Sequence, residues 1–250
     1  MKKELPKLTL ALAGLIAISY IAFSSRLVFA DMSTIKQLGF AVTMPFNIFS
    51  FSFVHAGYGH LAANLAMILA AGTIIEARLG KRDLLGLFFL GSAFSALIFT
   101  FINREYLLVG ASAGAVSLLS AAVAVDPRTA ARNILAIAVA AILFVASISI
   151  YVELTTHRIE SEIRELEATR IAAQQEGDIE TLQEAEQQIT RKESLKQEIE
   201  EGIEVQESVP VNFEIHVYAA IFGALYLFLF RRDAVKGTAN KMMEYLSNAG

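Results

Sequence analysis

Long apolar stretches separated by short polar segments dominate the hydropathy pattern of this 250-residue chain. A helix needs about 20 mostly apolar residues to cross the hydrocarbon core of a bilayer. Six stretches approach that length: Leu8–Ala30, Tyr58–Ala77, Leu84–Ile102, Leu107–Val125, Ile134–Val152 and Val211–Phe230. The pattern therefore predicts an all-α membrane protein with six transmembrane helices.

One long polar region interrupts this pattern between the fifth and sixth stretches. Residues 153–210 hold sixteen acids and six bases, a net charge of 6 − 16 = −10. Gly177 can end a first helix in a left-handed cap, and Asp178 can cap a second helix. We predict a charged helical hairpin in solvent, with a dimerising coiled coil or a partly disordered arm as alternatives. Two apolar stripes at helical spacing support it: Ile159, Ile163 and Leu166, then Ile179, Leu182, Ala185 and Ile189.

The basic residues predict the orientation of the spans. They cluster before the first span, between the second and third, between the fourth and fifth, and after the sixth. The loops on the other side hold only Arg26, Lys36 and Arg104, so the positive-inside rule places both termini in the cytoplasm and the polar region outside. The predicted divisions are residues 1–152 with helices 1–5, the external hairpin 153–210, helix 6 over 211–230 and a basic cytoplasmic tail over 231–250.

Two further apolar segments need separate interpretation. Lys2 and Lys3, an apolar run and then Val28-Phe29-Ala30 imitate a secretory signal. The run is longer than the core of such a signal, which is usually about 7–15 residues, so we expect the first helix to be retained. The segment Gly39–Val54 is apolar and aromatic but contains Pro45 and Asn47, which predicts an outer loop at the membrane interface.

Composition narrows the classes of function. The mean hydropathy of +0.51 is too high for an ordinary soluble domain. The absence of cysteine excludes disulfides, thiolate metal sites and a cysteine nucleophile. A net charge of −4 without a basic face argues against nucleic acid as a partner.

A few polar side chains lie within the apolar spans, where their burial is expensive and indicates function. His60 and Asn64 are four residues apart in the second span and share a helix face. Ser112 lies in a run of glycine and alanine, and small residues extend along the face of the sixth span that carries His216. Because small residues permit close approach of membrane helices, we predict that Ser112 lies within hydrogen-bond reach of His216. A neighbouring base of this kind can activate a serine hydroxyl as a nucleophile.

These residues resemble the motifs of the rhomboid family of intramembrane serine proteases. The matching segments are His55–Asn64 and Glu76–Gly80 in the second helix, Gly110–Ser112 as a Gly-x-Ser motif, and His216 with Gly223 in the last helix. The resemblance covers about Leu8–Phe230 apart from the polar region. It implies a six-helix rhomboid-like bundle with the charged hairpin inserted between helices 5 and 6.

The resemblance also implies a reaction. Ser112 would attack a peptide carbonyl and His216 would act as its base, while His60 and Asn64, with the Ser112 backbone N–H, would form the oxyanion hole. The implied partners are transmembrane protein substrates and the lipid bilayer, without cofactor or metal, in a multi-pass protein of a prokaryotic plasma membrane. The hairpin 153–210 could also bind a partner or a second copy. The implied supporting residues are His55, Gly110, Gly114 and Gly223.

The sequence departs from the family pattern at four points. Ala113 and Ala219 replace common glycines, but both preserve small size. Val116 stands where an aromatic ring often packs on the histidine, which weakens the expected support of His216. The chain has no tryptophan, so the tryptophan–arginine pair common in the first outer loop is missing.

Other interpretations remain open at this point. The main alternative is an inactive or weak rhomboid-like protein that binds transmembrane clients, and a small transporter is a weaker one. Taken singly, Ser112 could be a packing residue and His216 an interfacial one. His60 and Asn64 could simply join helices by hydrogen bonding. The histidines could bind a metal, but no carboxylate or cysteine joins them at a ligand spacing.

Overall fold

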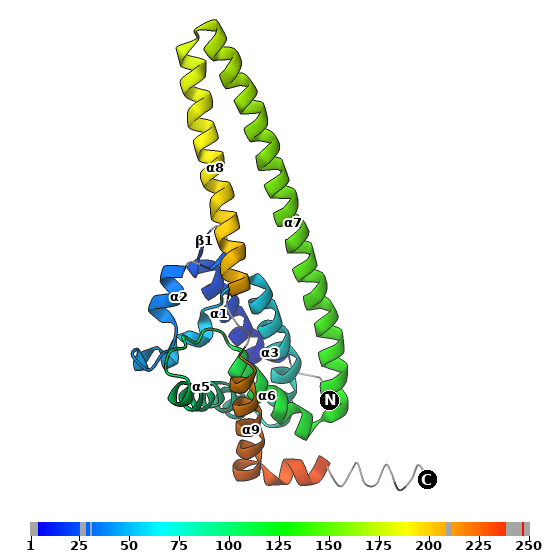
Figure 1. Cartoon of the computed structure of the whole chain (residues 1–250). Helices are drawn as coiled ribbons and strands as arrows, with labels where there is room; N and C mark the ends of the chain where they lie inside the picture. Colours follow the sequence, from blue (N-terminus) through cyan, green and yellow to red (C-terminus); the bar gives the residue numbers. More distant parts are fainter. Residues whose placement is uncertain (1–4, 26–28, 31, 209–211, 239–246, 248–250) are drawn as a thin grey trace.

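The structure, a computed structural model, describes residues 5–25, 29–30, 32–208, 212–238 and 247. Helices form most of it, as Figure 1 shows. The predicted boundary at residues 210 and 211, Arg26 and most of the predicted tail lie outside the described residues. The elements of the first half are α1 (Lys7–Phe23), β1 (Ser24–Ser25), β2 (Phe29–Ala30), α2 (Met32–Leu38), the short helices η1 (Pro45–Phe49) and η2 (Phe51–Phe53), and α3 (Tyr58–Arg78). They are followed by α4 (Lys81–Leu85), η3 (Gly86–Leu90), α5 (Gly91–Ile102), α6 (Ser112–Val125), α7 (Pro127–Glu176), α8 (Ile179–Ser208) and α9 (Phe213–Phe230).

Several helices suit a membrane. Within the described residues, four helical stretches are long and apolar enough to cross one: Tyr58–Arg78, Lys81–Ile102, Pro127–Glu176 and Phe213–Phe230. Helices α1 and α6 are also apolar but have only 17 and 14 residues. The helical fold and its apolar surface support an integral membrane protein, and the count of six spans stays a prediction.

Two predicted spans are shorter than expected. Helix α1 ends at Phe23 instead of reaching Ala30, because Ser24–Ser25 pairs with Phe29–Ala30 in a small antiparallel ribbon. Helix α6 begins at Ser112 instead of Leu107, because Leu108 forms a β-bridge with Phe40. The predicted bounds of both spans were wrong for the same reason. Hydropathy counts apolar residues, but it does not show that some of them pair as strands outside the helix.

Helix α6 occupies the centre of the bundle and packs against α3, α5, α7 and α9. Its small residues make this position possible. A Cβ added to Gly114 would lie 2.7 Å from the Phe88 carbonyl oxygen, and one added to Gly223 of α9 would lie 2.4 Å from the Ser117 carbonyl oxygen. The Ser120 hydroxyl also donates to the Ala220 carbonyl at 2.8 Å. Helices α6 and α9 are therefore in backbone-to-backbone contact, as the small residues predicted.

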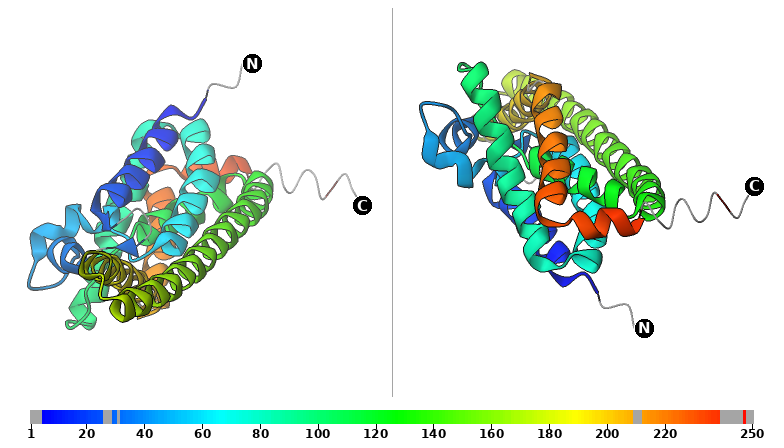
Figure 2. Two further views of the ribbon diagram at one scale, coloured as in Figure 1. Left: turned by 90° about the horizontal axis from the view of Figure 1, so that it is seen from above. Right: turned by 90° about the horizontal axis from the view of Figure 1, so that it is seen from below.

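The fifth predicted span and the first arm of the hairpin form one helix. Helix α7 runs for 50 residues without a break from Pro127 to Glu176. The predicted boundary at residues 152 and 153 is therefore not a structural boundary, because a change from apolar to polar side chains leaves the backbone hydrogen-bond ladder intact. Figure 2 shows α7 along one edge of the bundle, where it packs beside α3.

The hairpin itself is a pair of antiparallel helices, α7 and α8, that projects from the bundle (Figure 1). Gly177 ends α7 with φ +72°, and the Asp178 carboxylate accepts the Thr181 N–H at 3.2 Å, as the capping pattern predicted. The two helices bury an apolar seam and are joined by ion pairs of Glu160 with Lys196 and Glu162 with Lys192. The buried seam contains Ile159, Ala173, Ala185 and Ile189.

The hairpin is anchored at its base. Helix α8 contacts β2, and Ile199 packs against the main hydrophobic core. Because α7 also packs beside α3 and α8 contacts β2, the hairpin is attached to the bundle through both arms.

The opposite end of α9 is held by a buried carboxylate. Asp83 of α4 is 2% exposed, and it accepts hydrogen bonds from Arg231 Nε at 2.9 Å and Arg231 Nη2 at 2.8 Å. The Tyr226 hydroxyl donates to the same carboxylate at 3.0 Å. The sequence alone does not predict this contact, because Asp83 and Arg231 are 148 residues apart.

Replacing Arg231 by glutamine should lower the unfolding temperature, because it leaves the buried Asp83 carboxylate without its charged partner. Thermal unfolding in detergent measures the effect. The control is Arg232→Gln, an exposed neighbour whose loss should change stability by about 0.5 kcal/mol or less. Equal destabilisation by both substitutions would contradict a specific role for Arg231.

Candidate active site

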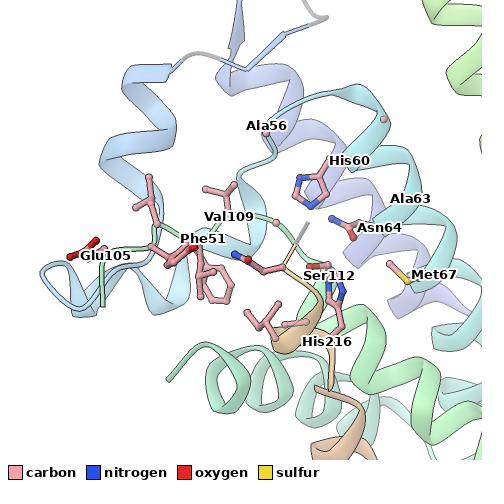
Figure 3. Close-up of a pocket in the computed structure, with 18 residues that line it drawn as sticks. Phe51, Ala56, His60, Ala63, Asn64, Met67, Glu105, Val109, Ser112 and His216 are labelled. Carbon is pink, nitrogen blue, oxygen red and sulfur yellow. The ribbon is translucent and has the colours of Figure 1, made fainter. Parts of the chain in front are cut away.

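The predicted catalytic residues line one cavity. It has a volume of about 710 Å³ and is lined by residues of α3, α6, α9 and the loop before α6. Figure 3 shows His60 and Asn64 on α3, Ser112 at the start of α6 and His216 near the start of α9, with their side chains at this cavity. The structure therefore brings together four residues that are spread over more than 150 positions of the sequence.

Ser112 and His216 come from helices in direct contact. The close packing at Gly223 holds α9 against α6. Ser112 at the start of α6 and His216 near the start of α9 both line the cavity (Figure 3). Neither side chain is fully buried, so both can meet a substrate. In the described structure no hydrogen bond joins them. Catalytic hydrogen bonds are often long in the absence of substrate and tighten when it binds.

The loop before Ser112 takes a conformation that requires glycine. Gly110 has φ +104°, and its N–H donates to the Phe51 carbonyl at 2.8 Å. A Cβ at this position would lie 2.5 Å from His60 Cε1, 2.6 Å from His60 Nε2 and 3.4 Å from Asn64 Nδ2. The peptide backbone just before Ser112 therefore lies directly against the imidazole and the amide of α3.

Asn64 has an unpaired donor. The residue is 1% exposed, and its Nδ2 atom is buried without a hydrogen-bond partner among the described residues. Buried polar groups are almost always hydrogen-bonded, and an unpaired donor carries an energetic penalty of about 1–3 kcal/mol. Because this donor belongs to a cavity-lining residue beside Gly110, it is suited to a hydrogen-bond acceptor that enters the cavity.

His55 lies behind this arrangement, away from the cavity. It is 1% exposed, and its Nε2 accepts the Ala111 N–H at 3.4 Å. Its ring centroid is 5.1 Å from that of His60 in an edge-on arrangement. His55 thus contacts both the loop that precedes Ser112 and one of the cavity histidines.

Much of the cavity wall was not predicted from the sequence. This part of the wall includes residues 105–109 of the loop before α6, together with Phe51, Met67 and Ile215. The only sequence signal for these residues was their position next to the motifs. Glu214, two positions before His216, does not line the cavity. Its carboxylate accepts a hydrogen bond from Asn103 Nδ2 at 3.3 Å and so joins α9 to the end of α5.

The chain matches the family model of the Rhomboid domain over residues 43–164. It belongs to the rhomboid family. The match includes His60, Asn64 and Ser112 and ends before His216, which the tertiary structure brings to the same cavity. Rhomboid proteins are generally intramembrane serine proteases, although inactive members exist. No curated protein and no solved structure matches the chain.

Proposed function

We propose that this rhomboid protein is a serine endopeptidase that cleaves membrane-anchored proteins within or near the bilayer. The observation that carries the proposal is the unpaired Asn64 amide beside Gly110 in the cavity that also holds Ser112 and His216. A packing serine or an interfacial histidine explains neither the unpaired donor nor the left-handed glycine before the serine.

The reaction we propose uses the two polar sides of the cavity. Ser112 Oγ attacks the carbonyl carbon of the scissile peptide while His216 takes the hydroxyl proton. The resulting oxyanion is stabilised by Asn64 Nδ2, His60 and the Ser112 backbone N–H. His216 returns the proton to the leaving amine as the C–N bond breaks. Water, deprotonated by His216, then hydrolyses the acyl-enzyme and restores the serine.

The other residues of the site have supporting roles in this proposal. His55 positions the loop before Ser112 through the Ala111 N–H, and Gly114 and Gly223 permit the close packing around α6. The partly buried Val116 side chain packs against a hydrophobic cluster that contains Ala113 of α6 and Ala219 of α9. Val116 places no aromatic ring against His216, so we expect a slower enzyme than one with an aromatic support.

The membrane arrangement that we propose has six spans, both termini in the cytoplasm and the hairpin outside. It rests on the basic residues around the inner ends of α3, α7 and α9. The proposed setting is a prokaryotic plasma membrane, and the proposed partners are transmembrane protein substrates.

Fluorophosphonate labelling tests the proposed activity. Wild-type protein in detergent and in liposomes should label covalently, and both Ser112→Ala and His216→Ala should abolish the label. The matched control is Ser120→Ala, which removes a serine of the same helix that only bonds to Ala220. If wild-type protein labels no better than Ser112→Ala, the chain is instead an inactive rhomboid-like protein, for which the absent Ser112–His216 hydrogen bond is the supporting observation.

A second prediction concerns the hairpin, which we propose screens substrates. The alternatives are docking of a partner or a second copy, and a solvated extension without a role in cleavage. Because α7 continues from the apolar region into the hairpin, replacing residues 156–205 by a Gly/Ser linker removes a rigid extension of that helix. The variant should keep fluorophosphonate labelling but cleave a panel of transmembrane substrates with changed relative rates. Unchanged cleavage of every substrate would show that the hairpin has no part in selection.

A further inference from the structure

A second cavity lies at the other end of α3 from the candidate active site. It has a volume of about 620 Å³ and is lined by the start of α1, the end of α3 and the start of α7. Since Glu76 follows His60 by 16 positions on the same helix, the two cavities are separated by roughly 24 Å along the helix axis. The proposed reaction does not use this cavity.

The cavity combines apolar walls with a basic rim. Leu5, Pro6 and Ala77 contribute apolar surface, while Lys81 and Arg132 contribute exposed cations. These basic residues stand where the apolar part of α3 ends and the apolar part of α7 begins. That position corresponds to the depth of the lipid headgroups.

The acidic groups of the cavity are already engaged. The Glu76 carboxylate accepts the N–H groups of Leu8 at 3.0 Å and Thr9 at 2.8 Å, together with the Thr9 hydroxyl at 2.8 Å. It therefore caps the start of α1, where a negative charge is favourable.

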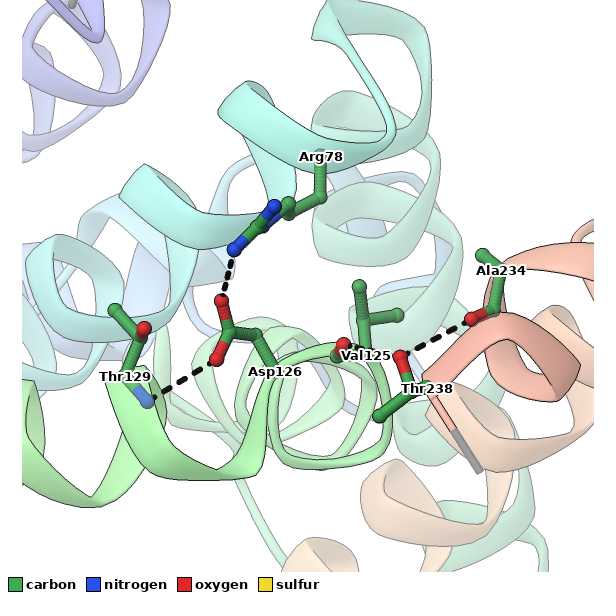
Figure 4. Close-up of polar contacts among 6 residues, drawn as sticks. All are labelled: Arg78, Val125, Asp126, Thr129, Ala234 and Thr238. Atoms are coloured by element: carbon green, nitrogen blue, oxygen red, sulfur yellow. Dashed lines mark hydrogen bonds and ion pairs between the residues drawn. The ribbon is translucent and has the colours of Figure 1, made fainter. Parts of the chain in front are cut away.

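The second acid, Asp126, is neutralised within the cavity wall. It accepts a hydrogen bond from the Arg78 guanidinium and one from the Thr129 N–H at 3.2 Å, as Figure 4 shows. Partial burial alone would raise the pKa of Asp126, but these bonds and the Arg78 charge hold the pKa below its ordinary value. Asp126 is therefore ionised and paired with Arg78.

The lining holds three cations, Arg78, Lys81 and Arg132, and two carboxylates, Glu76 and Asp126, so its net charge is 3 − 2 = +1. Among the residues that the structure describes, neither Lys81 nor Arg132 forms an ion pair. A ligand that complements the cavity must carry an anionic group for these two cations and an apolar part for the walls. Basic pockets between transmembrane helices at a membrane surface bind anionic lipid headgroups.

We propose that this cavity binds an anionic phospholipid, with its phosphate between Lys81 and Arg132 and its acyl chains along the apolar wall. The lipid would then contact α1, α3 and α7 together. Inorganic phosphate carries a negative charge like the phospholipid headgroup but has no acyl chains, so it would leave the apolar wall of the cavity uncovered.

Native mass spectrometry of the full chain in detergent tests the proposal by titration with phosphatidylglycerol and phosphatidylcholine. Wild-type protein should bind phosphatidylglycerol about tenfold more tightly than phosphatidylcholine. The double substitution Lys81→Gln and Arg132→Gln should remove this preference. Ala77→Phe, which fills the cavity and keeps both charges, should weaken phosphatidylglycerol binding to a similar degree.

The matched control is the pair Arg82→Gln and Lys236→Gln, which removes two exposed basic residues outside the cavity lining. This control should retain the wild-type preference, and unfolding temperatures should confirm that all variants are folded. Equal loss in the control pair, or no loss in Ala77→Phe, would mean general surface attraction and overturn the proposal. Inorganic phosphate that displaces the lipid at equal concentration would identify a free-phosphate site and overturn it as well.

Discussion

Substituting Gly110 by alanine is expected to lower the turnover of a transmembrane substrate by about 10³-fold or more, because the change disturbs two parts of the site at once. The left-handed φ of +104° is strained for alanine by about 1–2 kcal/mol. The new Cβ would also lie 2.5 Å from the His60 ring, so the ring or the loop must move. Movement of the loop shifts Ser112, which is only two residues further along.

The control for this prediction is Gly80→Ala. Gly80 has the same φ of +104°, but a Cβ added there meets nothing within 4 Å. Gly80→Ala should therefore lower the unfolding temperature through backbone strain and leave turnover within about threefold of the wild-type value. If both variants lose turnover equally, the effect of Gly110→Ala is one of folding and the proposed contact with His60 is irrelevant.

Asn64→Ala should separate activity from stability. Removing one oxyanion donor typically lowers turnover by about 10²–10³-fold. The same substitution removes a buried Nδ2 donor that has no hydrogen-bond partner in the described part of the chain, so the unfolding temperature should stay the same or rise. The loss should appear in kcat, with little change in KM, because the donor binds charge that exists only in the transition state.

Asn64→Asp provides the second half of this experiment. It keeps the size of the side chain but replaces the amide donor by a carboxylate, which repels an oxyanion. Turnover should fall at least as far as in Asn64→Ala. A variant that loses stability and activity in proportion would instead assign Asn64 to helix packing.

These two predictions depend on different levels of information. The four-residue spacing of His60 and Asn64 already indicated a common helix face, because helical periodicity is local. The left-handed conformation of Gly110 could not be read from its neighbours. It follows from the bridge between Phe40 and Leu108 and from the bond to the Phe51 carbonyl, both made with residues far along the chain.

The long helix α7 shows the opposite case. Its backbone is continuous because residues 127–176 contain no interior proline or glycine to interrupt it. The sequence therefore contained the information, but the predicted boundary lay at residue 152, where the side chains change from apolar to polar and the helix continues.

The sequence by itself determined the helical membrane class, the left-handed cap at Gly177 and the candidate residues Ser112, His216, His60 and Asn64. Each of these follows from local spacing, hydropathy or motif. Only the tertiary structure decided that Asp83 fixes the end of α9 and that Gly110 lies against His60. These contacts join segments that lie far apart along the chain, and such contacts depend on how the helices pack around α6.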